Sequence, residues 1–287
     1  MPSIRTVVGA SLLAATALVA RAPSSHAQGV LVAPPGIFID HRTRSGAFEL
    51  YNPGNEPAEV AISLEFGYPV TDSTGRLSLK LVESPDASMP SAARWIEAFP
   101  RRLVLRPLER QTVRLLARPP AALADGEYWS RIIVETKGGT MQLETPADSG
   151  GITVGLKLQV RTVVALFYRK GAVATGVAVD GVRAGLDGDS VVVRARLTRT
   201  GAGAFLGTVH GVLADTAGKE VGGFATPVAV YYTLEPRFTI PAAALPPGPY
   251  VLRLTVDTQR DDVQRPSLLP IAAVHDSVAL TVAPRAP

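Results

Sequence analysis

One stretch constrains the fold more than any other: Ile152 to Arg169, with the sequence ITVGLKLQVRTVVALFYR. Side chains of a β-strand alternate between two faces with period two. The even positions form one apolar face, whereas the odd positions are polar up to Arg161 and turn apolar from Val163 onward. This pattern predicts a single strand of roughly three times the usual length. The apolar side chains of its first half could be offered to a second chain.

A second interpretation of this stretch stays open. The strand could pair along its whole length within its own sheets, with the apolar face as part of the core. Lys157, Gln159 and Arg161 suit an outward face in either case. The pattern alone therefore does not separate a donated strand from a purely structural one.

The rest of the chain also has a β-type pattern. Alternating runs rich in valine and threonine are broken by turn signals, with 24 prolines and 26 glycines, and almost no run has a helical period. Short strands at regular spacing predict an all-β fold of two immunoglobulin-like β-sandwich domains in series. We place the domains at residues 28–169 and 170–283, with a disordered tail at 284–287. In the second domain we expect one strand over Val230–Ile240, with Tyr231 and Tyr232 in its core.

The first 27 residues predict a secretory signal peptide. Arg5 gives a basic start, Val7 to Ala20 is apolar, and Ser25-His26-Ala27 offers a cleavage site. About 14 apolar residues are too few to span a bilayer. We therefore expect an exported, periplasmic protein without a membrane span. Its formal charge of +4 falls to +2 because Arg5 and Arg21 leave, which argues against a nucleic-acid partner.

The sequence offers little for catalysis. Beyond the signal peptide only His41, His210 and His275 remain, and their spacing suits no metal site. Cysteine is absent, and we find neither a nucleophile elbow nor a phosphate loop. We expect no enzyme activity, no cofactor and no metal.

Four motifs, taken in order along residues 30–170, resemble the PapD-like periplasmic chaperones of chaperone–usher pilus assembly. They are Ile37-Phe38-Ile39-Asp40 followed by Glu49-Leu50-Tyr51-Asn52-Pro53, Phe99-Pro100 with the strands after it, Gly126-Glu127-Tyr128-Trp129, and Leu166-Phe167-Tyr168-Arg169. In the family a proline usually follows the last motif, and here that position is Lys170. The second domain is similar only in its strand pattern.

The resemblance implies a function in fimbrium biogenesis by donor strand complementation. Such chaperones insert a strand into an incomplete pilus subunit, whose open sheet edge would otherwise aggregate. By position relative to Leu166, the donated side chains would be Leu156, Leu158 and Val160. The implied partners are exported pilin-like or surface subunits, and an outer-membrane usher is a further candidate.

The chain departs from the family at two positions. The family holds the subunit's C-terminal carboxylate with two basic residues, and the matching positions here are Ala165 and Gly36, or Pro35 in a shifted register. A carboxylate in a partly dry cleft needs charged donors. The candidate replacements are Arg42, Arg44, Arg131 and Arg161. The alternative function is an exported, non-catalytic structural or surface-binding protein with two immunoglobulin-like domains.

Overall fold

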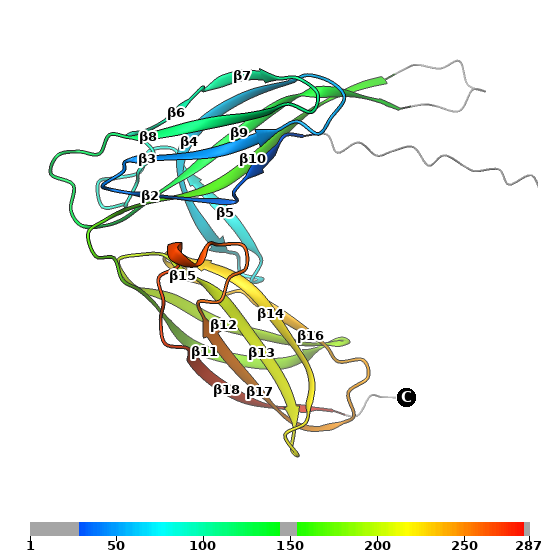
Figure 1. Ribbon diagram of the computed structural model, residues 1–287. Coiled ribbons are helices and arrows are strands. Elements are labelled where there is room, and N and C mark those ends of the chain that lie inside the picture. Colours follow the sequence, from blue (N-terminus) through cyan, green and yellow to red (C-terminus); the bar gives the residue numbers. More distant parts are fainter. Residues whose placement is uncertain (1–28, 144–153, 284–287) are drawn as a thin grey trace, which may run out of the picture.

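The computed structural model describes residues 29–143 and 154–283, and for 138–143 and 154–158 the backbone only. The predicted signal peptide and the predicted tail at 284–287 lie outside this part. Two β-sandwiches follow one another along the chain (Figure 1). The first contains β1 (Leu31–Ala33), β2 (Gly36–Asp40), β3 (Ser45–Tyr51), β4 (Ala58–Thr71), β5 (Leu77–Val82), β6 (Ile96–Phe99), β7 (Arg102–Leu105), β8 (Arg110–Ala117), β9 (Gly126–Leu143) and β10 (Val154–Lys170).

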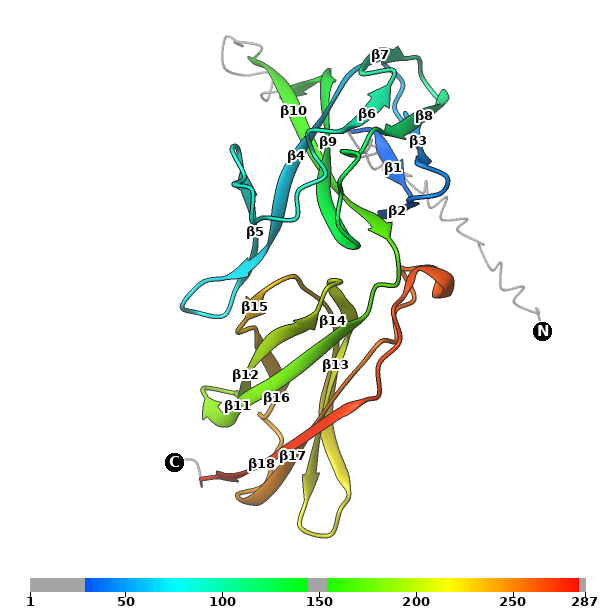
Figure 2. The ribbon, with the colours of Figure 1, turned by 90° about the vertical axis from the view of Figure 1, so that its left-hand side faces the viewer.

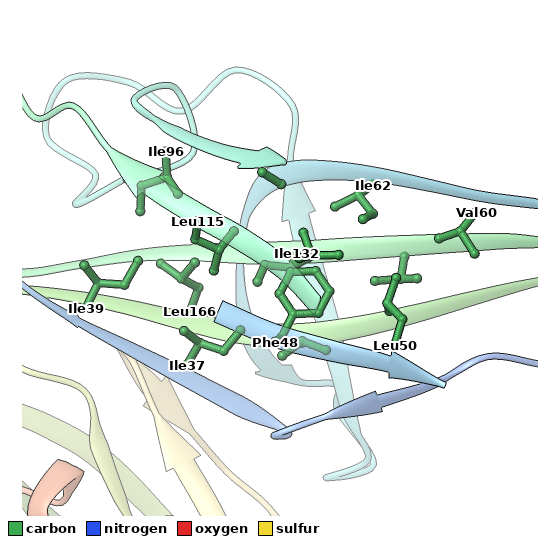
Figure 3. Close-up of a cluster of buried hydrophobic side chains, with 14 of the residues drawn as sticks. Ile37, Ile39, Phe48, Leu50, Val60, Ile62, Ile96, Leu115, Ile132 and Leu166 are labelled. Atoms are coloured by element: carbon green, nitrogen blue, oxygen red, sulfur yellow. The ribbon is translucent and has the colours of Figure 1, made fainter. Parts of the chain in front are cut away.

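The first sandwich packs a sheet of order β1-β3-β8-β6 on a sheet of order β2-β10-β9-β4-β5, with β7 paired to β4. Alternation within each strand supplies its core, as in β8, where Val113, Leu115 and Ala117 are buried and the residues between them are not. Figure 3 shows how side chains of both sheets meet, among them Phe48 and Leu166.

The turn after β3 is held by Asn52, which is 4% exposed. Its Nδ2 donates to the carbonyls of Glu56, Leu105 and Arg106 at 2.8, 3.1 and 3.1 Å, and its Oδ1 accepts from the Gly54 amide at 3.0 Å. The side-chain amide of Asn52 therefore bonds backbone groups both in the β3–β4 connection and at the end of β7.

The second sandwich contains one sheet of order β11-β12-β15, with β16 paired to β12, and one of order β14-β13-β17-β18. Its elements are β11 (Thr175–Asp187), β12 (Ser190–Gly201), β13 (Phe205–Asp215), β14 (Glu220–Val230), β15 (Thr233–Leu234), β16 (Arg237–Pro241), β17 (Gly248–Asp257), a short 3₁₀ helix (Arg265–Ser267) and β18 (Val274–Val282). The two sandwiches confirm the predicted fold class. Within the described ranges, no helix has the length and apolar character needed to cross a bilayer.

The expectation of one strand over Val230–Ile240 is wrong. The segment changes sheets: β14 ends at Val230, and β15 and β16 join the opposite sheet. Pro236, between β15 and β16, has no N–H for a ladder hydrogen bond. Tyr231 and Tyr232 pack in a cluster at the domain junction rather than in the second core.

The passage between the domains depends on a glycine. Gly171, directly after β10, has φ of +70°, and a Cβ there would clash with the Asp125 side chain. Lys170 precedes it, its Nζ donating to the Leu123 carbonyl and lying 3.3 Å from Asp125 Oδ1. Lysine therefore has a local partner at the position where the family that the motifs resemble has proline.

Candidate functional site: the long strand and the domain junction

Strand β10 is paired unequally on its two sides. On one side it pairs antiparallel with β9 from Val154 to Lys170. On the other side it pairs with β2, in parallel, only from Ala165 to Arg169. Within the described residues, no strand pairs with the remaining stretch, 154–164, on that side. The backbone N–H and C=O groups of this open margin are therefore available to another strand.

The margin belongs to a two-stranded arm. The ends of β9 and β10 extend past the other strands of the first sandwich (Figure 1). The arm contains one irregularity, where Lys157 and Gln159 of β10 face Thr140 and Lys137 of β9. The extra residue lies on β9, so the alternation of β10 itself is not interrupted.

The backbone of the three predicted donor residues belongs to this margin. Val164, Leu166 and Tyr168 point into the first core, and alternation places Val160 on the same face. Val160 is half-buried. The side chains of Leu156 and Leu158 lie outside the described part, which includes only their backbone in β10. Their role as donors stays a prediction.

The other face of β10, formed by the odd-numbered residues, is polar up to Arg161 and apolar further along. Arg161 is exposed and bonds Glu65 at 2.6 Å, with Glu135 at 3.6 Å. Ala165 and Phe167, further along, join the cluster between the domains. Val163 is still 37% exposed, so the second domain covers the sheet only from Ala165 onward.

The junction between the domains is an aromatic cluster. Its buried members are Phe66, Trp129 and Phe167 of the first domain and Ala204, Leu206 and Tyr231 of the second. The ring centroids of Trp129 and Tyr231 are 4.7 Å apart, and Phe167 stacks on Phe38 at the same distance. Direct contact of this kind fixes Ala165–Arg169 of β10, which we call its stem, against the second domain.

A buried carboxylate joins the two domains at this cluster. The Glu127 side chain is fully buried. Its Oε1 accepts from Trp129 Nε1 and from the Ala204 amide, both at 2.8 Å, and its Oε2 accepts from Arg169 Nε at 2.6 Å. Arg169 in turn donates to the Ser267 carbonyl at 2.6 Å. The sequence analysis noted Glu127 and Arg169 only as parts of motifs, and no local pattern signals that they meet.

The two positions that lack the family's basic residues are neighbours in the sheet. Gly36, Ala165 and Arg131 are directly opposite one another across β2, β10 and β9. Of the four candidate anchors, Arg131 is therefore the only one in this row. It is 6% exposed, its Nε donates to the Gly67 carbonyl at 3.0 Å, and its guanidinium lies 4.8 Å from the Tyr231 ring centroid.

The environment of Arg131 is unusual. Neither its Nη2 nor the Tyr231 hydroxyl meets a partner with hydrogen-bond geometry among the described residues. Burial raises the pKa of Tyr231 to about 12, although the nearby Arg131 charge acts in the opposite direction. The row thus contains one cation, but this cation faces the junction.

The other three candidate anchors are not brought together with it. Arg42 and Arg44 are exposed in the turn after β2, beyond the Arg169 end of β10, and Arg44 Nε donates to the His41 carbonyl at 3.2 Å. Arg161 has its carboxylate partners on β4 and β9. The structure therefore supports no cluster of these four residues.

A small hollow adjoins Gly36. It has a volume of about 190 Å³ and is lined by apolar residues of the first domain and by Asp262, Gln264 and Ser267 of the second. Asp262 pairs with Arg260 at 2.6 and 2.5 Å, and these donated bonds lower the pKa of its carboxyl. The loop between β17 and β18 therefore brings a carboxylate, paired with Arg260, close to Gly36.

The described residues contain no group of three or more potential metal ligands. Comparison with known proteins found no matching family model and no matching curated protein. Solved structures do match. The YadV chaperone aligns at 15% identity and a TM-score of 0.43, over 88% of this chain and 99% of its own.

Two further matches are of the same kind. The complex of CsuC with the tip adhesion subunit CsuE, from the archaic chaperone–usher Csu pili of Acinetobacter baumannii, aligns at 14% identity and a TM-score of 0.44, over 86% and 97% of the chains. The periplasmic chaperone SfaE aligns at 11% identity and a TM-score of 0.41, over 86% and 98%. These are proteins of the kind that the sequence motifs resemble. We base the functional proposal on this chain's own geometry.

Proposed function

We propose that this protein is a periplasmic chaperone that binds exported pilin-like subunits by donating the first half of β10. The observation that carries the proposal is the open margin over residues 154–164, next to a strand stem that is fixed by β2, β9 and the second domain. A client that lacks its last strand would pair with this margin.

The energy of such a contact is adequate without a cofactor. Each buried Leu or Val side chain contributes roughly 1.5–3 kcal/mol, so Leu156, Leu158 and Val160 would together contribute roughly 4–9 kcal/mol. Backbone hydrogen bonds along the margin would fix the register in which the client's strand pairs with β10. Association costs at least about 4 kcal/mol, so the donor side chains decide whether the complex forms.

The client's C-terminus requires a different arrangement from the family's. We infer that Arg131 is the best placed of the candidate anchors, because it lies in the row of Gly36 and Ala165. The residues that line the hollow beside Gly36 include no cation, and Asp262 there is already paired with Arg260. This feature also favours the second candidate function, an exported binding module that holds no subunit.

Co-purification from native periplasm identifies the bound chains, and co-expression then tests the strand. In the full chain, Leu158→Glu and Val160→Glu should each reduce recovery of the client at least tenfold, because a carboxylate would enter an apolar groove. Gln159→Glu is the matched control, since it adds the same charge to the exposed face of the same strand. Thermal unfolding of each variant establishes that it is folded.

The possible results separate the two functions. Loss of the client with both core-face variants, and retention with Gln159→Glu, supports strand donation. Equal client recovery for all three folded variants overturns it and leaves the binding module.

A further inference from the structure

A second contact between the domains lies at the far edge of the sheet from the open margin. The turn between β4 and β5 reaches the second domain beside β15 (Figure 2). The Arg237 amide donates to the Gly75 carbonyl at 3.0 Å, and the Glu235 amide donates to Thr71 Oγ1 at 2.9 Å. Gly75 has φ of +84°, and a Cβ there would lie 2.8 Å from Arg237 N. The close approach therefore requires glycine.

Three guanidinium groups border a hollow at this contact. Its volume is about 380 Å³, and it is lined by Thr74, Gly75 and Arg76 of the first domain and by Arg194 and Arg237 of the second. No carboxylate is among these residues. The hollow is therefore a concentration of positive charge shared by both domains.

The neighbouring carboxylates are already engaged. Asp72 accepts bonds from the Thr74 and Arg76 amides and from the Thr74 hydroxyl, and these bonds lower its pKa. Glu235 bonds Arg196 at 2.7 Å and lies 3.8 Å from Arg183. Asp187 lies 3.2 Å from Arg237 and is largely exposed.

Two of the three arginines consequently lack a carboxylate partner within the described residues. Arg194 donates only to the carbonyls of Ser73 and Thr74, at 3.1 and 2.8 Å. Arg76 has neither an ion pair nor a side-chain hydrogen bond in the described part of the chain. Guanidinium groups without counter-charges form strong, bidentate bonds to oxyanions.

We propose that this hollow binds an oxyanion of the phosphate monoester class. Three guanidinium groups suit a doubly charged anion better than a single carboxylate. An opening toward solvent leaves room for the organic part of a monoester. Because Arg76 belongs to one domain and Arg194 and Arg237 to the other, the bound anion would strengthen the junction between them.

Isothermal titration of the full-length protein at constant ionic strength tests the site. The probes are glucose 6-phosphate, inorganic phosphate and acetate. We expect saturable 1:1 binding of glucose 6-phosphate, at least as tight as that of inorganic phosphate, and none of acetate. Arg76→Gln should weaken it at least about tenfold, the value of a bond to a charged group. Arg253→Gln, an exposed arginine on β17, is the matched control and should bind like the wild type.

Arg76→Gln is the informative variant because its side chain supports no other contact in the described part of the chain. Absence of saturable binding would overturn the proposal. Equal weakening in Arg76→Gln and Arg253→Gln would also overturn it, since that result indicates general screening of charge. Binding of inorganic phosphate without glucose 6-phosphate would exclude the monoester class.

Discussion

The buried Glu127 carboxylate allows a quantitative prediction. In Glu127→Gln the side chain keeps its shape, and its one remaining oxygen can still accept from Trp129 Nε1 and from the Ala204 amide. The new amide group, however, presents hydrogens to Arg169 Nε, which donates to Glu127 Oε2 at 2.6 Å in the wild type. The variant therefore loses the ion pair. In its place two hydrogen-bond donors, the new side-chain NH2 group and Arg169 Nε, point at each other.

The expected loss follows from burial. The Arg169 side chain is 16% exposed, so little water can replace its partner. Removal of one member of a buried ion pair typically costs about 3–5 kcal/mol. We expect the lower end, about 3 kcal/mol, because Arg169 keeps its bond to the Ser267 carbonyl. Glu127→Ala should lose more, since it also leaves two buried N–H groups unpaired, at about 1–3 kcal/mol each.

Calorimetry and urea unfolding measure these differences. The unfolding temperature of the first domain should fall by about 10 °C in Glu127→Gln. Glu97→Gln is the control, because the pair of half-buried Glu97 with exposed Arg118, at 3.7 Å, should contribute less than about 1 kcal/mol. A double-mutant cycle with Arg169→Gln isolates the pair. A loss below about 1 kcal/mol in Glu127→Gln would refute the assigned role of the carboxylate.

Three further predictions concern single side chains. Phe167→Ala should destabilise the protein by about 3–5 kcal/mol in urea unfolding because Phe167 is 2% exposed, whereas Phe99→Ala, at 50% exposure, should cost less than about 1 kcal/mol. Asn52→Ala should cost about 2 kcal/mol because buried carbonyls lose their donor, and Asn52→Asp should cost more because a carboxylate would face them; equal stabilities would contradict this. Tyr231→Phe should change stability at pH 7 by less than about 1 kcal/mol. With its pKa raised to about 12, Tyr231 stays protonated after the unfolded chain ionises near pH 10, so wild-type stability should fall between about pH 10 and 12. Urea unfolding at pH 9 and 11.5 should show a fall of roughly 2 kcal/mol in the wild type that the Phe variant lacks.

The parts of the fold that could be predicted are those with local alternation. In β8 and β10 the period-two pattern reflects one buried face, so both their existence and their core residues follow from the sequence. The prediction of one strand over Val230–Ile240 was wrong because it used the same pattern. Its apolar residues are buried, but against two different partners, and only Pro236 indicated that the segment is divided.

The features that escaped prediction depend on contacts between distant parts of the chain. Glu127 meets Ala204, and Arg169 meets Ser267, because the second domain docks on the first. Arg76, Arg194 and Arg237 likewise lie far apart in sequence and converge at the domain junction. No periodic sequence pattern predicts either set of contacts, because both depend on how the two sandwiches are placed relative to each other.

The change of pattern within β10 connects these observations. Odd positions become apolar at Val163, which is 37% exposed, and the next two, Ala165 and Phe167, lie where β2 pairs and where the second domain covers the sheet. The stem beyond this point is fixed by the aromatic cluster and by the bond from Arg169 to Glu127. The arm before it pairs with β9, its Arg161 side chain also bonds Glu65 of β4, and no described strand pairs with its other margin. A strand that is rigid at one end and already extended loses little conformational entropy when a client pairs with it. Under the proposed function, the second domain would support client binding through the stem of β10, without contacting the client itself.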